Sequence, residues 1–393
     1  MTQRVQCDVV VIGGGIAGLW LINCLKQQGY IAYLCEKNAL GSGQTLRSQG
    51  ILHGGTKYAL TGKLTKAALG VANMPAIWQA CLQGKGVLDL RAVKILSNIH
   101  YLWMKGRYTA QIKSFITSKV LSEESKVIAA KDYPLLFKYP EFVGSVCAVQ
   151  ETVVDIPSLL RVLSKPVEKN LLQAEETCEL IIESEQVKGV LIASQGKQLI
   201  LEAKVYLLTA GEGNQSLLKQ LSSAPTMQRR PLQMTWLRFP KFVAEYQVYF
   251  HCVEQGGSPS ITITTHQDKA GRTIWYLGGD ISESGVQRSP EEQIAFAKRE
   301  LKRLMPWIDL SNTEWGTSSL DRAEMATVEG KKPESISIEK VTDNLLVGWP
   351  TKLVLAPLLA EKLIERINFI EKTKQHDNIT WPTAKLARPI WWE

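Results

Sequence analysis

The first 36 residues constrain the fold of this chain more than any other part of it. Residues 7–12 form an apolar run with the length and composition of a buried parallel strand. A glycine-rich turn follows, then a helical apolar pattern over residues 19–28 and a second apolar run over residues 31–35. A strand, a tight turn, a helix and a second strand in this order predict an α/β fold built on a parallel sheet.

The glycines of the turn and the acid after the second strand predict a dinucleotide site. They have the spacing G-x-G-x-x-G, in which the first permits a tight turn, the second lets a pyrophosphate approach the backbone and the third lets the helix pack closely on the strand. The helix N-terminus presents N–H groups to phosphates, and a carboxylate at residue 36 would accept hydrogen bonds from ribose hydroxyls. The residues expected to contact the ligand are Gly13, Gly15, Ile16, Ala17, Gly18, Glu36 and Lys37.

Three later segments favour FAD over a nicotinamide cofactor. Residues 41–58 are rich in Gly, Ser, Thr and Gln, so their backbone can wind past a large planar ligand. The runs VYLLTAG (205–211) and NLLVG (344–348) read as strands that end in small residues, and an amphipathic helix over residues 356–370 would direct its dipole at the flavin. The residues expected to contact FAD here are Gln44, Thr45, Ser48, Gln49, Gly50, Ile51, Ala210, Gly211, Gly348, Lys352 and Leu353.

With these motifs the chain resembles the FAD-dependent family of D-amino-acid oxidase, glycine oxidase and glycerol-3-phosphate dehydrogenase. The segments SQGILHGGTKY (48–58) and RRPLQM (229–234) resemble the glycerol-3-phosphate and 2-hydroxyglutarate dehydrogenase branches, whereas LVLAP (353–357) resembles glycine oxidase. The resemblance implies hydride transfer to flavin N5 from a C–H bond of a small anionic substrate. That substrate is a 2-hydroxy acid, a glycerol-phosphate-like alcohol or an amino acid, and oxygen or a quinone accepts the electrons.

The resemblance also implies two domains. A discontinuous Rossmann-type FAD domain is expected over residues 1–80, 150–222 and 320–393, and a substrate domain on an antiparallel sheet over residues 81–149 and 223–319. Candidate strands of that sheet are residues 235–239, 247–252, 260–265 and 273–277. Ser289, followed by a proline and two acids, is expected to cap a helix that runs to about Met305.

Two residues are candidates for the chemistry. His53 is either the base that takes a hydroxyl proton or a residue that only contacts the flavin. Arg322 is either a clamp for the substrate anion or a partner in a salt bridge with Asp321 or Glu324. Arg47 and Lys57 are further basic residues near the presumed flavin loop, and Lys352 would place a positive charge near flavin N1 or lie on the surface.

The remaining sequence features limit the kinds of partner and the cellular location that can be expected. The net charge of +8 is spread along the chain, so no nucleic-acid partner is expected. None of the seven cysteines forms a C-x-x-C pair, and no metal site is predicted. Without a run of about twenty apolar residues no membrane span is predicted, and the cytoplasm is the expected location. The Trp391-Trp392 pair would either dock on a membrane or partner, as in a flavin-binding subunit without turnover, or pack on its own domain.

Overall fold

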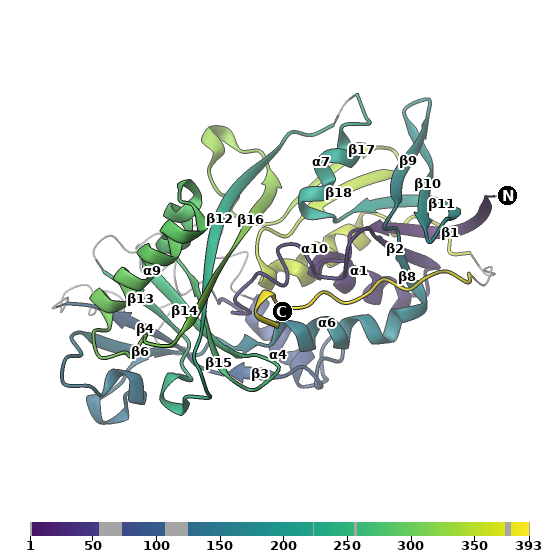
Figure 1. The fold of residues 1–393 in the computed structure, drawn as a ribbon. Helices are drawn as coiled ribbons and strands as arrows, with labels where there is room; N and C mark the ends of the chain where they lie inside the picture. Colours follow the sequence, from purple (N-terminus) through teal and green to yellow (C-terminus); the bar gives the residue numbers. More distant parts are fainter. Residues whose placement is uncertain are drawn as a thin grey trace.

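The computed structural model describes residues 2–54, 73–106, 125–222, 224–254, 258–373 and 379–392. Two large sheets organise these residues, one in each half of the molecule (Figure 1). None of the helices in these ranges is both long enough and apolar enough to cross a lipid bilayer. The expected Lys57 lies outside the described residues.

A parallel sheet forms the half that contains the N-terminus, and this confirms the predicted fold class. Its strand order is β18-β11-β1-β2-β8, with β17 added antiparallel to β18 and the β9–β10 hairpin added antiparallel to β11. The strands are β1 (Gln3–Ile12), β2 (Ala32–Glu36), β8 (Leu171–Gln173), β9 (Thr177–Glu183), β10 (Gln186–Ser194), β11 (Lys197–Leu208), β17 (Ser337–Thr342) and β18 (Leu345–Trp349).

Both faces of this sheet are buried, which explains the continuous apolar run in β1. Val9 and Val11 pack on the helical side, whereas Val10 and Ile12 join the core on the other face. The helices that supply the first core are α1 (Ile16–Gln27), α4 (Met74–Leu82), α6 (Ile156–Ser164) and α10 (Ala356–Glu365). Helix α10 is shorter than the 356–370 pattern predicts, since it ends at Glu365 with Arg366 at the C-cap.

An antiparallel sheet forms the other half. Its order is β16-β12-β15-β14-β13-β4-β6-β5, and only β4 and β13 are parallel neighbours. The strands are β4 (His100–Met104), β5 (Ser125–Val127), β6 (Ser145–Val149), β12 (Met227–Arg238), β13 (Phe250–Val253), β14 (Pro259–Gln267), β15 (Thr273–Gly278) and β16 (Glu314–Met325). A small two-stranded sheet joins β3 (Ile95–Ser97) to β7 (Val153–Val154).

Helix α9 (Pro290–Leu304) packs on this sheet through Ala297, Leu301 and Leu304. Its start is the one expected from sequence, since Ser289 and Glu292 form a reciprocal capping box. The four candidate strands correspond to β12, β13, β14 and β15, although β13 begins three residues later than residue 247. Strand β16 pairs with β12 along its whole length, so the expected domain boundary at residue 320 falls inside a strand of the antiparallel sheet.

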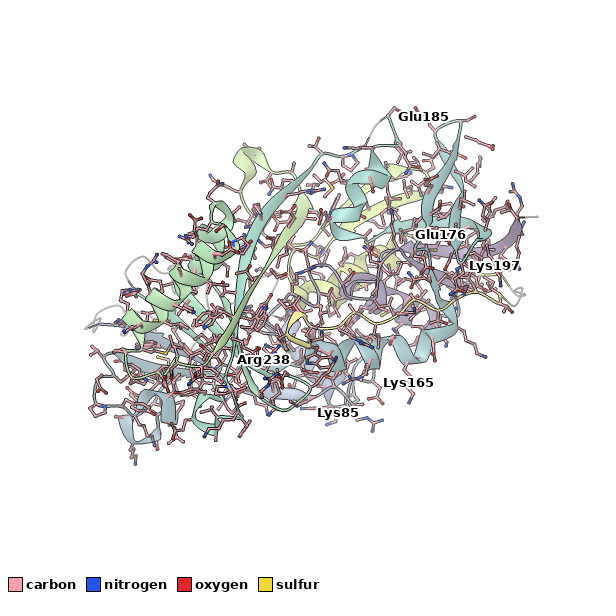
Figure 2. All side chains as sticks on the ribbon, in the orientation of Figure 1. Lys85, Lys165, Glu176, Glu185, Lys197 and Arg238 are labelled. Atoms are coloured by element: carbon pink, nitrogen blue, oxygen red, sulfur yellow. The ribbon has the colours of Figure 1, made fainter. Side chains whose placement is uncertain are left out.

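The C-terminal tryptophans pack on the chain's own antiparallel sheet. Trp391 is buried against His266 and Tyr276, with ring centroids 5.0 and 5.1 Å away. Its carbonyl accepts a hydrogen bond from Arg238, which lies beside the C-terminal turn in Figure 2. Trp391 therefore does not serve as a docking residue for a membrane or a partner, because a docking side chain must be accessible and Trp391 is buried.

Replacing Trp391 with alanine should lower the free energy of unfolding by about 3–5 kcal/mol, since a buried aromatic ring is lost. Urea unfolding followed by far-UV circular dichroism measures this change. The matched control is Trp392→Ala, because Trp392 is only half-buried, although it contacts the same cluster and its Nε1 donates to the Gln267 carbonyl at 3.3 Å. Equal losses for both variants would contradict the burial argument.

Candidate active site

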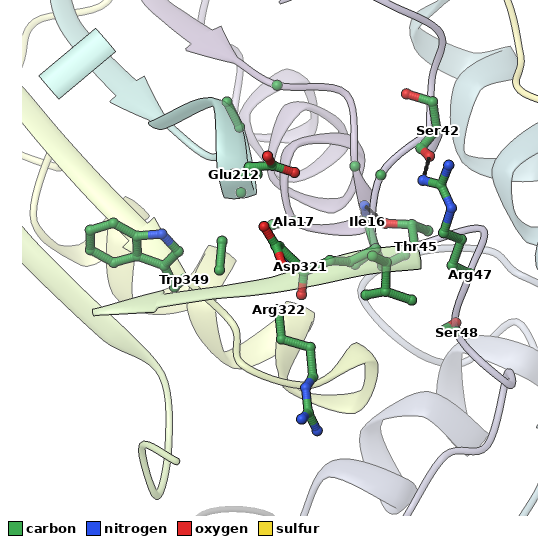
Figure 3. Close-up of a pocket in the computed structure, with 18 of the residues that line it drawn as sticks. Ile16, Ala17, Ser42, Thr45, Arg47, Ser48, Glu212, Asp321, Arg322 and Trp349 are labelled. Carbon is green, nitrogen blue, oxygen red and sulfur yellow. Dashed lines mark hydrogen bonds between the residues drawn. The ribbon is translucent and has the colours of Figure 1, made fainter. Parts of the chain in front are cut away.

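A cleft of about 1040 Å³ lies between the two sheets. It starts at the carboxyl ends of the parallel strands, where ligands of open α/β sheets bind. Its other wall comes from β12, β13, β14 and β16, and part of this wall is drawn in Figure 3. The volume is at the upper end of the range for ligand sites, so a dinucleotide and a small second ligand fit together.

The glycine turn brings the backbone of the first wall close to the cleft. Gly13 has φ of 109°, and a Cβ there would lie 2.4 Å from Ala210 Cα. A Cβ at Gly18 would lie 1.9 Å from the Gly13 carbonyl oxygen, so this glycine lets α1 pack against β1. Gly15 provides no side-chain cap for helix α1, although the Ile16 N–H donates to Thr45 Oγ1 at 2.9 Å, and a helix N-terminus favours an anion.

Glu36 closes the same end of the cleft. Its Oε2 accepts a hydrogen bond from the Gly14 N–H at 2.6 Å, and its Oε1 accepts one from the Asn38 N–H at 2.8 Å. Burial raises the pKa of Glu36, although these N–H groups oppose the rise. The carboxylate is therefore fixed in orientation at the end of β2, as a ribose-binding acid must be.

The segment over residues 41–53 ties the two walls together. Arg47 donates to the Ser42 carbonyl at 2.6 Å (Figure 3) and to Ser318 Oγ at 3.0 Å on β16. Gln49 Nε2 donates to the carbonyls of Thr262 and Tyr276 on β14 and β15. Within the described ranges, Ser48 Oγ is buried without a hydrogen-bond partner. A buried hydroxyl without a partner beside the cleft fits a polar ligand that would bond it.

The loop over residues 349–353 also lines the cleft. Thr351 has φ of 57°, which is unusual for a β-branched residue and marks local backbone strain. Its hydroxyl donates to the Ser335 carbonyl at 3.1 Å. Trp349 Nε1 is buried and has no hydrogen-bond partner in the described part of the chain. A strained loop with such a donor is a further feature that fits a bound polar ligand.

His53 lies on the cleft with a carboxylate behind it. Its Nδ1 is 3.1 Å from Glu151 Oε2, and the Gly54 N–H donates to Glu151 Oε1 at 3.0 Å. The His53 ring stacks on that of His251 at a centroid distance of 5.5 Å, and His251 lies 4.2 Å from His100. Three of the five histidines of the chain therefore surround one carboxylate.

This carboxylate is ionised although it is buried. Burial would raise the pKa of Glu151, but His53, His100 and the Gly54 N–H together lower it to about 2. Burial also lowers the pKa of His100 to about 3, so this imidazole is neutral near pH 7. An anion hydrogen-bonded to one nitrogen of a histidine leaves the other nitrogen to act as a proton acceptor.

Arg322 extends from β16 at the same cleft (Figure 3). Its Nη1 pairs with Glu283 at 3.0 Å, and its Nε donates to the Arg230 carbonyl at 3.2 Å. Burial and the charge of Arg230 lower its pKa. Arg322 therefore does form a salt bridge, but not with the two neighbours suggested, because Asp321 pairs with Arg229 and Glu324 pairs with Arg230.

The structure brings most of the predicted residues to this one cleft and leaves four outside its lining. Three of the four are glycines that allow close packing. An added Cβ would lie 1.9 Å from Gly13 at Gly18, 2.2 Å from Val154 at Gly50 and 2.9 Å from Leu359 at Gly348. The fourth, Ile51, is buried in an apolar cluster. The predicted residues that line the cleft are Gly13, Gly15, Ile16, Ala17, Glu36, Lys37, Gln44, Thr45, Ser48, Gln49, His53, Ala210, Gly211, Arg322, Lys352 and Leu353.

Sequence reasoning missed Glu151, His100, His251 and Thr262. Each lies in or beside a short strand of the antiparallel sheet, and three are flanked by apolar residues that read as core. The scarcity of histidine was the one available signal, but it does not say which histidines meet.

Acid should destabilise the fold partly through Glu151. Its folded pKa of about 2 lies below the ordinary value of 4.5, so its contribution is complete above pH 4.5 and is lost as the pH falls toward 2. In the Glu151→Gln variant, this part of the loss of unfolding free energy between pH 4.5 and pH 2 should be absent. Urea unfolding in the presence of a metal chelator measures it across that pH range. Parallel losses in both proteins would show that the buried pair adds nothing.

Comparisons with known proteins agree with this geometry. The family model described as FAD dependent oxidoreductase matches residues 8–347. The chain is 40% identical to the "Probable FAD-dependent oxidoreductase PA4991" of Pseudomonas aeruginosa, over all of this chain and 99% of that one. The crystal structure of that protein superposes with a TM-score of 0.84, at 37% identity and with the same coverage.

More distant structures share the fold alone. The glycine oxidase of Geobacillus kaustophilus has a TM-score of 0.65 at 14% identity, with 96% of this chain and 97% of that chain covered. The L-α-glycerophosphate oxidase of Mycoplasma pneumoniae, solved with FAD bound, has a TM-score of 0.67 at 14% identity, with 96% and 100% covered. A glycine oxidase and a glycerophosphate oxidase therefore share this fold.

Proposed function

Because the chain belongs to the family of FAD-dependent oxidoreductases, we propose that it oxidises a small anionic alcohol, either a 2-hydroxy acid or a phosphate-bearing alcohol. The residues that line the cleft would hold FAD, which would supply a hydride acceptor for the substrate carbon. The parallel sheet is the FAD domain and the antiparallel sheet is the substrate domain. Strand β16 then belongs to the substrate domain, so residues 320–325 are assigned to that domain and not to the FAD domain.

The FAD would bind to the residues that line the first wall. Glu36 would hold the adenosine ribose, and the N-terminus of α1 with Gly13 and Gly15 would hold the pyrophosphate. Ser48 and Lys352 would bond the flavin end, where Ser48 Oγ is buried without another partner in the described ranges. This assignment is supported by donors and close backbone approaches that a dinucleotide requires.

The pairing of His53 with Glu151 is the observation that carries the choice of an alcohol. An alcohol must lose its hydroxyl proton when its C–H bond is oxidised, and a positioned histidine takes such a proton. Glu151 orients the His53 ring through Nδ1 at 3.1 Å and would stabilise the imidazolium that forms. An amine that binds in its neutral form carries a lone pair and can lose hydride without a base, so the pair favours an alcohol as substrate.

Arg322 would hold the substrate anion. Its present partner Glu283 is a solvent-exposed carboxylate, so a substrate carboxylate or phosphate can take its place. A guanidinium binds either group through two parallel hydrogen bonds. Amino-acid oxidation is the second candidate, favoured by the LVLAP segment over residues 353–357.

Anaerobic mixing of the FAD-loaded protein with 2-hydroxy acids, glycerol phosphates and amino acids tests the proposal. One of the first two classes should bleach the flavin absorbance, and oxygen or a quinone analogue should then restore it. Bleaching by amino acids alone would overturn the proposal and establish the second candidate. A protein that all three classes leave yellow would contradict both.

A further inference from the structure

The histidine cluster beside the cleft has the donor set of a metal site. His53 follows the loop over residues 41–52, Glu151 follows β6, and His251 lies in β13. One ligand atom from each of these three side chains lies within 4.8 Å of the other two. Two imidazoles and one carboxylate, contributed by three separate elements, match the His₂Glu set that binds zinc and leaves a fourth position open.

The spacing needs only a small closure to bind an ion. Around a tetrahedral zinc ion with bonds of about 2.1 Å, ligand atoms lie about 3.4 Å apart. His53 can supply this movement, because its side chain is 34% exposed and it stands on a loop. Glu151 and His251 are buried and therefore form the fixed part of the site.

Outer hydrogen bonds hold two of the three ligands in orientation. Thr262 Oγ1 lies 2.7 Å from His251 Nδ1, and the Gly54 N–H donates to Glu151 Oε1 at 3.0 Å. Metal-binding histidines and carboxylates usually carry such a second contact, which fixes the ring or the carboxylate plane.

Charge balance also favours a cation here. The Glu151 side chain is 5% exposed, and a buried carboxylate requires compensation for its charge. Among the described residues its ion-pair partner is His53. A divalent ion held by these side chains would supply this compensating charge.

We infer that His53, Glu151 and His251 form a binding site for one divalent ion of the zinc class, which the sequence did not predict. The site takes borderline ions that prefer nitrogen donors, and it rejects Mg²⁺, which prefers an octahedral shell of oxygens. In one respect the inference rests on the proposed function: His53 cannot accept a proton while it holds the ion, so Zn²⁺ inhibits substrate oxidation.

Zinc binding to the resting enzyme tests the site without any substrate. The FAD-loaded protein, free of affinity tag and treated with chelator, is titrated with ZnCl₂ by isothermal calorimetry. We expect one ion per chain, no binding of MgCl₂, and at least tenfold weaker Zn²⁺ binding in Glu151→Gln and His251→Gln. The outer-contact variant Thr262→Val should lose about tenfold or more.

His266→Gln is the matched control, because His266 is also a buried histidine of the same sheet but packs on Trp391. It should bind Zn²⁺ like the unchanged protein. FAD absorbance and melting temperature are measured for each variant. If the buried substitutions fail to fold, His53→Gln and Thr262→Val provide the comparison.

The inference is overturned if the unchanged protein binds no Zn²⁺, or if the cluster variants that fold bind it as His266→Gln does. Because no substrate is present, this outcome is independent of the bleaching experiment. A protein that binds Zn²⁺ in the cluster but is not bleached by alcohols keeps the metal site and loses the proposed function. Bleaching without Zn²⁺ binding gives the reverse result.

Discussion

Replacing His53 with asparagine should lower kcat/KM for the alcohol substrate by about 10²–10⁴-fold. Asparagine is close in size and still forms hydrogen bonds, but it cannot accept the hydroxyl proton. The FAD content should not change, since the base acts on the substrate and the ribose and pyrophosphate contacts lie elsewhere in the cleft. The rate of flavin bleaching in an anaerobic stopped-flow instrument measures the loss.

The Glu151→Gln variant tests whether His53 acts as a base or only contacts the flavin. Glutamine retains a hydrogen-bond partner for His53 Nδ1 but removes the charge that stabilises an imidazolium, so bleaching should slow by about tenfold or more. The His266→Asn variant removes a histidine outside the cleft and should bleach at the unchanged rate. If His53→Asn also bleaches at the unchanged rate, His53 contacts the flavin without acting as a base.

The parts of the site that sequence reasoning found are local in the chain. Gly13, Gly18 and Glu36 belong to one β-α-β unit, whose geometry is determined within 34 residues, Gln3 to Glu36. The spacing of apolar residues in the strands and in the helix, together with three glycines, specifies this unit without any long-range contact. The carboxyl end of β1 was therefore predictable as a ligand site.

The histidine cluster was not predictable, because long-range pairing creates it. His100 opens β4, which lies parallel to β13, and the register partners Tyr101 and Phe250 are 149 positions apart in the sequence. Glu151 comes from the loop after β6, on the other side of β4. No local period marks such a neighbour relation, so the two histidines read as core residues and Glu151 as an ordinary loop residue.

The salt bridges of Arg322 show the same limit at shorter range. Successive side chains of a strand point to opposite faces, so Asp321 cannot reach across to its neighbour Arg322. Glu324 lies on the same face as Arg322, but the β12–β16 register places Arg230 opposite Arg322, and Arg230 binds Glu324 diagonally across the pair of strands. Glu283 reaches Arg322 from helix α8 (Asp280–Glu283), which follows β15.

Replacing Gly18 with valine should weaken FAD binding by about 100-fold and yield a nearly colourless protein. Even the Cβ of the new side chain would lie 1.9 Å from the Gly13 carbonyl oxygen and 2.9 Å from Thr209 Oγ1. Helix α1 must then move away from β1, and its N-terminus leaves the place where it meets the pyrophosphate. The flavin absorbance of the purified protein and a fluorescence titration of the apoprotein with FAD measure the loss.

The control for this variant is Gly196→Ala at the turn between β10 and β11. A Cβ there meets nothing within 4 Å, and only the positive φ of 71° opposes the substitution. It should cost about 1 kcal/mol of folding free energy and leave FAD affinity unchanged. If Gly18→Val binds FAD as tightly as this control, the close approach of α1 to β1 does not position the cofactor. If both lose FAD equally, the effect reflects stability alone.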